Sequence, residues 1–494
     1  MSCAAVRNDL AGISVGGSAV KFSIFARVRG LFLISLGFVY PSLQPAQAMS
    51  LRDAVSLALI SNPQIGQAIQ DREALEFELK QAHGEYLPRV DFEGDVGIQK
   101  YDRQNPSSSN LFGTGLQDLF QNDEADLVVT QKIFDGYATI ADIERAASRV
   151  DSTSFRVWER SENIALAIAR EYIQVLLQDR IVQIADQNLA FHRNKVREIT
   201  AGVKDGTLTD ADQFQAEERL TAAIAKRKQA EEDLAEAKIR FFTLVGKPLE
   251  MIAPLPGLGL LPRALPQALG HAEQNNPTVA IAWADVDAAD AAILKARAQY
   301  YPDVFFEGRA RAGHDIDLNP GRTTDLSARL VMRWNLYDGG MKAAGEQEEI
   351  RRDSEARLKL DEIRREVEQD VRLAWDKRVR EADLEKTFAT QASQGAQVLS
   401  SYQDQFKVGR RSLLDVLDAQ NTRFNAQVLV AASEYASLFA DYQLLAASGD
   451  LLRTLNLSPP PQAQAIARAQ NGVPVPAPAE TDARYSPARQ KMPW

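Results

Sequence analysis

The chain has 494 residues, with 57 Lys and Arg against 67 Asp and Glu, which gives a net charge of −10. Its 45% hydrophobic and 25% charged residues are ordinary globular values and exclude wholesale disorder, and the acidic balance argues against nucleic acid as a partner. The single cysteine, Cys3, excludes a disulfide framework and a cysteine metal cluster.

The first 48 residues have the pattern of a secretory signal peptide. Basic residues, the last of them Arg29, precede a short apolar run over 31–39, and Ala46-Gln47-Ala48 supplies a small-residue cleavage site. A membrane anchor is the alternative, but a spanning helix needs about 20 apolar residues. We therefore expect residues 1–48 to be removed, which leaves a mature chain that begins at Met49 and contains no cysteine.

The rest of the chain contains an internal repeat. Short motifs recur in the same order in both halves: Asn62-Pro63 and Asn276-Pro277, Tyr86-Leu87-Pro88 and Tyr300-Tyr301-Pro302, Phe134-Asp135-Gly136 and Tyr337-Asp338-Gly339. We predict a first copy over 49–246, a Pro-rich connector over 247–263 and a second copy over 264–457. Residues 458–494 are rich in proline and poor in apolar side chains, which predicts a disordered tail.

Each copy is expected to contain very long helices. No proline lies within 138–247 or 342–458, and a proline inside a helix costs about 3 kcal/mol. The residues from 138 to 201 alone would span roughly 90 Å as one helix. Apolar positions that follow at alternating steps of four and three residues predict coiled-coil packing, with Arg227 as an imperfection: Ala216, Leu220, Ala223, Arg227, Ala230, Leu234, Ala237, Phe241.

Four strands are expected, at about 89–100, 126–136, 303–313 and 325–337. In the first, Val90 and Phe92 share one face while Asp91 and Glu93 share the other, and the last strand alternates in the same way. Such strands fit either a half-buried soluble hairpin or a transmembrane barrel around water, and aromatic residues near the strand ends favour the barrel.

If these strands span a membrane, several chains must share one barrel. Four strands cannot close, and open strand edges are not tolerated in hydrocarbon. Two chains would give eight strands and an interior filled by side chains, whereas three would give twelve strands and room for water. The charged inner face favours three chains.

Residues 406–420 (FKVGRRSLLDVLDAQ) resemble the hallmark segment of the TolC family of outer-membrane channel proteins, and the repeated motifs resemble that family over 50–457. The resemblance implies a mainly α fold with β: a homotrimer with a twelve-stranded outer-membrane β-barrel, four strands from each chain, continued by a long periplasmic coiled-coil α-helical barrel. It also implies three partners, which are a periplasmic adaptor (membrane fusion) protein, an inner-membrane ABC transporter or other pump, and outer-membrane lipid.

The resemblance also implies a gate at the periplasmic tip of the helical barrel. The matching positions here are Asp212, Phe406, Arg411, Asp415 and Asp418. Threefold symmetry would bring Asp415 and Asp418 together as a ring of six carboxylates, and contacts from Arg411 to Asp212 would hold the tip shut. Phe406 stands where the family has a tyrosine, so one hydroxyl contact is lost. An ordinary solvated helix face is the alternative interpretation of these charges.

No catalytic, metal or cofactor motif is present in the sequence. The four histidines are scattered, and Asp315-Ile316-Asp317, which begins like a calcium loop, is followed by Pro320 where glycine is required. We therefore expect no enzyme. The favoured function is a passive duct for type I protein secretion, with small-molecule efflux and a soluble periplasmic coiled-coil adaptor as the alternatives.

Overall fold

The structure is a computed structural model that describes residues 48–101, 118–255, 257–259, 261–314, 316 and 321–473. The predicted signal peptide lies outside the described residues, except for Ala48. The calcium-like loop also lies outside them, except for Ile316, and so do residues 474–494.

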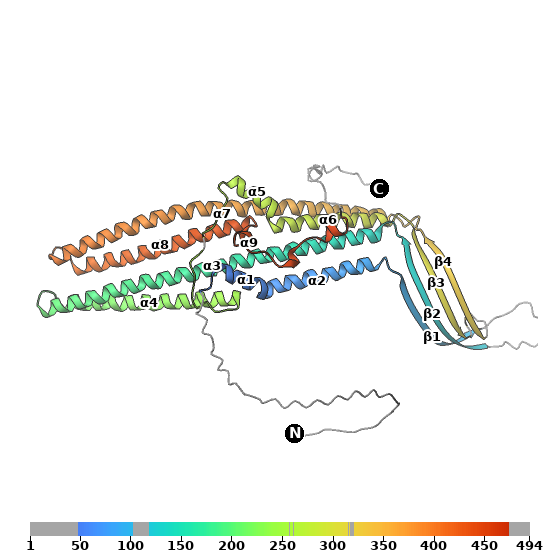
Figure 1. The fold of residues 1–494 in the computed structure, drawn as a ribbon, viewed down its shortest axis with the longest axis horizontal. Coiled ribbons are helices and arrows are strands. Elements are labelled where there is room, and N and C mark those ends of the chain that lie inside the picture. The colour runs from blue at the N-terminus through green and yellow to red at the C-terminus, as the bar shows by residue number, and fades with distance from the viewer. Residues whose placement is uncertain are drawn as a thin grey trace, which may run out of the picture. The chain divides into compact units, whose positions relative to one another are not determined.

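The order of elements in the first half recurs in the second (Figure 1). The first half contains α1 (Leu51–Ser61), α2 (Pro63–Gly84), β1 (Arg89–Tyr101), β2 (Asp118–Phe134), α3 (Ala138–Lys204) and α4 (Asp210–Val245). The second contains α5 (Leu265–Asn275), α6 (Pro277–Ala298), β3 (Asp303–His314), β4 (Arg322–Arg333), α7 (Met341–Lys407) and α8 (Leu413–Ala447). Helices α3 and α7 have 67 residues each, and α2 and α6 have 22 each. Short segments α9 (Leu451–Thr454), η2 (Pro461–Ala463) and α10 (Ala467–Gln470) follow.

The four strands form one antiparallel sheet in the order β1-β2-β3-β4, so β1 and β4 are its edges. Strand β2 begins at Asp118 rather than near 126, because its ladder with β1 continues as far as Tyr101. Strand β4 ends at Arg333 rather than near 337, because β3 offers no partner beyond Asp303. The indole of Trp334 instead donates a hydrogen bond to the carbonyl of Tyr300 at 3.1 Å.

The two faces of the sheet differ as the alternation predicts. One face exposes large apolar side chains, including Val96 at 78% and Leu326 at 83%. The other face carries a cross-strand ladder of ion pairs, Arg309 with Asp126, Arg311 with Glu124 and Arg329 with Glu307. A sheet that exposes its apolar face and pairs its charges on the other is the reverse of a soluble half-buried sheet.

Heptad packing joins the long helices. In α4, Ala216, Ala223, Ala230 and Ala237 recur every seven residues and are buried, and α4 packs along α3. The predicted coiled-coil face is therefore confirmed. Arg227, the imperfection in the pattern, reaches sideways to Asp186 of α3 at 2.5 Å and does not enter the core.

The repeated Asn-Pro motif fixes the start of α2 and of α6. Asn62 and Asn276 are the N-caps, and their side-chain oxygens accept backbone hydrogen bonds at 2.9 and 2.8 Å. Their amide nitrogens donate to the carbonyls of Leu244 and Ala447, which lie in the last turns of α4 and α8. One asparagine in each half thus links the start of one helix to the end of another.

The segment after α9 differs from the predicted disordered tail. Residues 458–473 are described, and Ala463 and Ala467 are buried where η2 and α10 lie against α3. Arg468 pairs with Asp151 of α3 at 2.9 Å and also with Asp287 of α6. The prediction of disorder from 458 is therefore wrong as far as Val473, because a few alanines and one arginine supply contacts that the composition does not reveal.

None of the helices in the described ranges is both long enough and apolar enough to cross a membrane.

Candidate functional site

The predicted gate residues lie at the two turns that end the long helical hairpins. In the α3–α4 turn, Gly206 has φ of +73°, a conformation that favours glycine. Thr209 then caps α4: its hydroxyl accepts from the backbone N–H of Asp212 at 3.3 Å, and the Asp212 carboxylate accepts from the N–H of Thr209 at 3.0 Å. Asp212 is therefore half of a capping box.

The α7–α8 turn repeats this design. Gly409 has φ of +71°, and Ser412 and Asp415 form the same reciprocal capping box. The hydroxyl and N–H of Ser412, together with Arg411, lower the pKa of the Asp415 carboxyl below its ordinary value. Asp415 is therefore ionised at neutral pH and is held at the start of its helix.

Arg411 is fixed by its own turn. Its Nε donates to Gln405 at 3.0 Å, its guanidinium lies 4.3 Å from the ring centre of Tyr402, and a nitrogen lies 3.7 Å from the Asp415 carboxylate. Within the described part of a single chain, no hydrogen bond or ion pair joins Arg411 to Asp212.

Phe406 joins an apolar cluster at the hairpin ends. It packs with Ile199, Ala216, Leu413 and Leu417, which come from α3, α4 and α8. The ring that replaces the family's tyrosine thus contributes packing between the two hairpins at this position.

Polar contacts continue between the two hairpins just beyond this cluster. Arg219 of α4 donates to the Asp418 carboxylate at 3.2 Å, Lys226 donates to Asn421 at 2.7 Å, and the buried Gln420 donates to Asn188 of α3 at 2.9 Å. We call these three pairs the inter-hairpin seam. The contacts of this seam are polar, whereas α3 and α4 within the first hairpin are joined by the buried alanines of α4.

A buried histidine lies beside the seam. Burial, followed by the charges of Arg219 and Lys226, lowers the pKa of His192 to about 4. His192 is therefore neutral at neutral pH, and it adds no charge to the seam.

The structure thus brings Arg411 together with Asp415, and Asp418 together with Arg219, while Asp212 stays within the cap of its own helix. Tyr402 and Arg219 were missed by sequence reasoning. The two capping boxes were readable from the sequence, because Thr209-x-x-Asp212 and Ser412-x-x-Asp415 follow the cap pattern.

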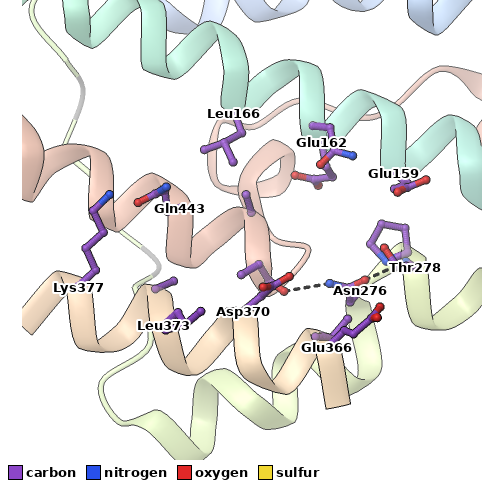
Figure 2. A pocket seen from close by; sticks show the side chains of 16 residues that line it. Glu159, Glu162, Leu166, Asn276, Thr278, Glu366, Asp370, Leu373, Lys377 and Gln443 are labelled. Carbon is purple, nitrogen blue, oxygen red and sulfur yellow. Dashed lines mark hydrogen bonds between the residues drawn. The ribbon is translucent and has the colours of Figure 1, made fainter. Parts of the chain in front are cut away.

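A separate cavity of about 400 Å³ lies among α3, α6, α7 and α8 (Figure 2). Its lining includes the carboxyl groups of Glu159, Glu162, Glu366 and Asp370. Glu162 accepts hydrogen bonds from the Trp158 indole and from the backbone N–H of Leu452, both at 3.3 Å. Burial raises the pKa of the Glu162 carboxyl to about 7, so this contact between α3 and α9 is sensitive to pH.

In the described ranges, no group of three or more His, Cys, Asp or Glu side chains is placed to hold a metal ion.

Comparison with known proteins identifies the family. The family model described as "Outer membrane efflux protein" matches residues 54–247 and 268–450. The chain is 26% identical to the outer membrane efflux protein BepC of Brucella suis over 330 residues, which are 65% of this chain and 71% of BepC. It is 24% identical to the proteases secretion protein PrtF of Dickeya chrysanthemi, covering 82% of this chain and 89% of PrtF. It is 23% identical to the outer membrane protein TolC of Escherichia coli, covering 82% of this chain and 83% of TolC.

Solved structures agree on the fold. CusC matches with a TM-score of 0.70 at 16% identity, covering 81% of this chain and 92% of CusC. The outer membrane protein VceC of Vibrio cholerae matches with a TM-score of 0.66 at 16% identity, covering 81% of this chain and 96% of VceC. The resemblance to the TolC family is thereby confirmed, and the adaptor alternative is excluded. The chain belongs to the outer membrane efflux protein family, and it is a non-enzymatic transport protein of the outer membrane.

Proposed function

We propose that three copies of the chain form one export duct, with a shared twelve-stranded barrel in the outer membrane and a tunnel of long helices in the periplasm. The observation that carries this proposal is the open sheet. Each of its edge strands, β1 and β4, has one side without a strand partner in the described chain, yet the sheet exposes an apolar face that suits lipid. Unpaired edges cannot lie in hydrocarbon, so the sheet must be completed by further copies.

The ion-paired face of the sheet supports a wet interior. Arginine and carboxylate side chains line β2, β3 and β4 on this face, and such charges belong beside water. An eight-stranded barrel of two copies has an interior just wide enough for side chains to fill, so three copies suit an aqueous duct.

The duct is passive, and its energy comes from partners. The sequence carries no nucleotide-binding loop. A periplasmic adaptor and an inner-membrane ABC transporter or other pump would therefore supply the cargo and the driving force. The gate is formed by Asp212, Phe406, Arg411, Asp415 and Asp418 at the hairpin turns, which are the ends farthest from the strands along both hairpins.

Type I protein secretion is the favoured use of the duct. PrtF, a protein named for protease secretion, aligns with more of this chain than BepC, which is named for efflux. Small-molecule efflux is the second candidate, because BepC is the more identical of the two relatives.

Two experiments test this proposal. In cells that lack the protein, we expect at least one large polypeptide to disappear from the culture medium, while drug sensitivity stays unchanged. Restoration by the wild-type gene is the control. If the proteins in the culture medium stay unchanged and drug sensitivity increases, the result would favour small-molecule efflux.

The shared barrel is tested by cysteine cross-linking. The mature chain has no cysteine, so double variants that pair Val96→Cys on β1 with Leu326→Cys, Ala328→Cys or Leu330→Cys on β4 report only these contacts. Within one chain the two edges are about 14 Å apart across three strand spacings, too far for a disulfide. We expect dimer and trimer bands for at least one pair and none for the single variants. Absence of bands from every pair would contradict a shared barrel.

A further inference from the structure

The two edge strands carry opposite charges on the same face of the sheet. On β1 the ion-paired face presents Arg89 followed by three carboxylates, Asp91, Glu93 and Asp95, whereas on β4 it presents Asp325 followed by Arg329 and Arg333. The β1 edge is therefore acidic in net charge, and the β4 edge is basic in net charge.

The carboxylates of β1 face further carboxylates within their own chain. The strand register places Glu93 opposite Asp126 and Asp95 opposite Glu124. Like charges directly opposite each other on neighbouring strands are destabilising. The carboxylates of β2 are already engaged by β3, because Asp126 pairs with Arg309 and Glu124 pairs with Arg311.

Glu93 forms no ion pair in the described part of its own chain. Its side chain is exposed, and Arg89, the cation that interacts with it electrostatically, pairs with Asp91 at 2.7 Å. An ion-pair partner for Glu93 can therefore come from beyond the β1 edge.

The arginines of β4 are available at the opposite edge. Arg333 is exposed and lies 4.6 Å from the ring centre of Phe305, with no ion pair among the described residues. Arg329 pairs with Glu307, yet its side chain remains 56% exposed.

The alternation of the strands fixes how two such edges meet. Successive strands run antiparallel, so β1 and β4 run in opposite directions and would pair antiparallel across a join between copies. Odd-numbered residues lie on the charged face of both strands. In every register that keeps the apolar face continuous, Arg329 and Arg333 therefore lie on the same face as Asp91 and Glu93. A register that sets Arg333 opposite Asp91 or Glu93 brings the opposite charges together.

We propose that β1 of one copy pairs with β4 of a second copy, and that Asp91 and Glu93 form ion pairs with Arg329 and Arg333 across the join. This inference rests on the proposed shared barrel and names the contacts that close it. It also explains the direction of assembly, because a β1–β1 join would oppose carboxylates and a β4–β4 join would oppose arginines. Charge would thus favour the head-to-tail contact that produces a closed ring.

Charge exchange tests the inference in the full chain extracted from outer membranes. Glu93→Arg and Arg333→Glu should each reduce the fraction of trimer that survives mild heating in detergent, by about tenfold because every join in the ring is affected. The double variant Glu93→Arg/Arg333→Glu restores opposite charges and should recover most of the trimer. Thr130→Arg, which adds a positive charge opposite Glu307 on the same face of the interior strand β2, should leave the trimer intact.

The outcomes separate this inference from the proposed duct. Absence of any trimer in the wild-type protein would overturn both. A wild-type trimer that neither single variant weakens, or that the double variant does not recover, would overturn the charged join alone. If the single variants fail to insert in the membrane, the double variant decides the question. Insertion of the double variant as a trimer would support the charged join, and failure of the double variant to insert would contradict the charged join.

Discussion

Arg219 of α4 lies 3.2 Å from the carboxylate of Asp418 in α8, and this contact joins the two helical hairpins of one chain near their turns. Asp418 is one of the two carboxylates that each chain is expected to contribute to the ring at the tunnel entrance. Arg219 therefore supplies a positive charge beside Asp418, as Arg411 does beside Asp415.

Replacement of this cation should change ion selectivity. We expect Arg219→Gln to make the channel more cation-selective, because the charge of Asp418 is no longer offset. The contact is partly exposed, so its loss should cost only about 0.2–1 kcal/mol of stability. Reversal potentials across a salt gradient in planar bilayers measure the change. Arg227→Gln, which breaks a pair within one hairpin, is the control, and an equal effect of both variants would count against the assignment.

Neutralising the ring itself should have the opposite effect. Asp415→Asn combined with Asp418→Asn should lower cation selectivity, since as many as six negative charges leave the entrance of a trimer. The asparagine at 415 retains an oxygen that can accept from Ser412, so the helix cap is preserved. Unchanged reversal potentials would show that these two residues do not line the pore.

Two substitutions at Asp212 separate its charge from its role in the cap. Asp212→Asn keeps an acceptor for the N–H of Thr209 and removes the charge, whereas Asp212→Ala removes both. If the charge holds the tip closed, both variants should raise the conductance of the resting channel, as should Arg411→Ser. Only Asp212→Ala should also destabilise the helix start, by about 1 kcal/mol. If all three variants conduct like the wild type, the gate assignment fails.

The buried Glu162 should make stability depend on pH. Its carboxyl keeps its proton up to about pH 7 in the folded protein, whereas in the unfolded chain it releases the proton near its ordinary pKa of 4.5. The folded state therefore binds more protons between these values, and stability is lost as pH rises through this window. At about 1.4 kcal/mol for each pKa unit, the total is on the order of 3 kcal/mol.

Thermal unfolding of the extracted protein between pH 5 and 8 measures this effect. Glu162→Gln retains an oxygen for Trp158 and Leu452 and cannot ionise, so its unfolding temperature should vary less with pH than that of the wild type. Parallel curves for the two proteins would show that Glu162 does not titrate in this range.

The ion pairs of Arg468 should stabilise the helical part of the molecule. Arg468→Ala leaves Asp151 and Asp287, both nearly fully buried, without their cation. Breaking a buried pair in this way costs about 3–5 kcal/mol. Arg380→Ala is the matched control, because Arg380 is 74% exposed and its ion pair among the described residues is with Asp376 of its own helix. Similar unfolding temperatures for the two variants would show that the segment after α9 does not brace the helices.

Much of the fold could be predicted because its signals are local. The seven-residue spacing of Ala216, Ala223 and Ala230 sets the buried face of α4, and the alternation from Val90 to Ile98 sets the faces of β1. Neither signal depends on distant parts of the chain. The ends of β2 and β4 depend on where the partner strand stops, so they could not be predicted from the strand alone.

The candidate site was predictable only in part. The family resemblance selects Asp418, but its partner Arg219 lies 199 positions away in the sequence and is found only when the two hairpins are placed together. The same holds for Arg468, which meets Asp151 across 317 positions. Phe406 was expected to weaken a latch, whereas it also packs with Leu417 and Ile199 between the hairpins.

The most direct test of the account is the molar mass of the native protein in detergent-extracted outer membranes, measured by light scattering with the detergent contribution subtracted. A barrel shared by three chains predicts a particle of three chains in that fraction. A monomer or dimer recovered from the soluble periplasm would contradict a duct built on a shared barrel.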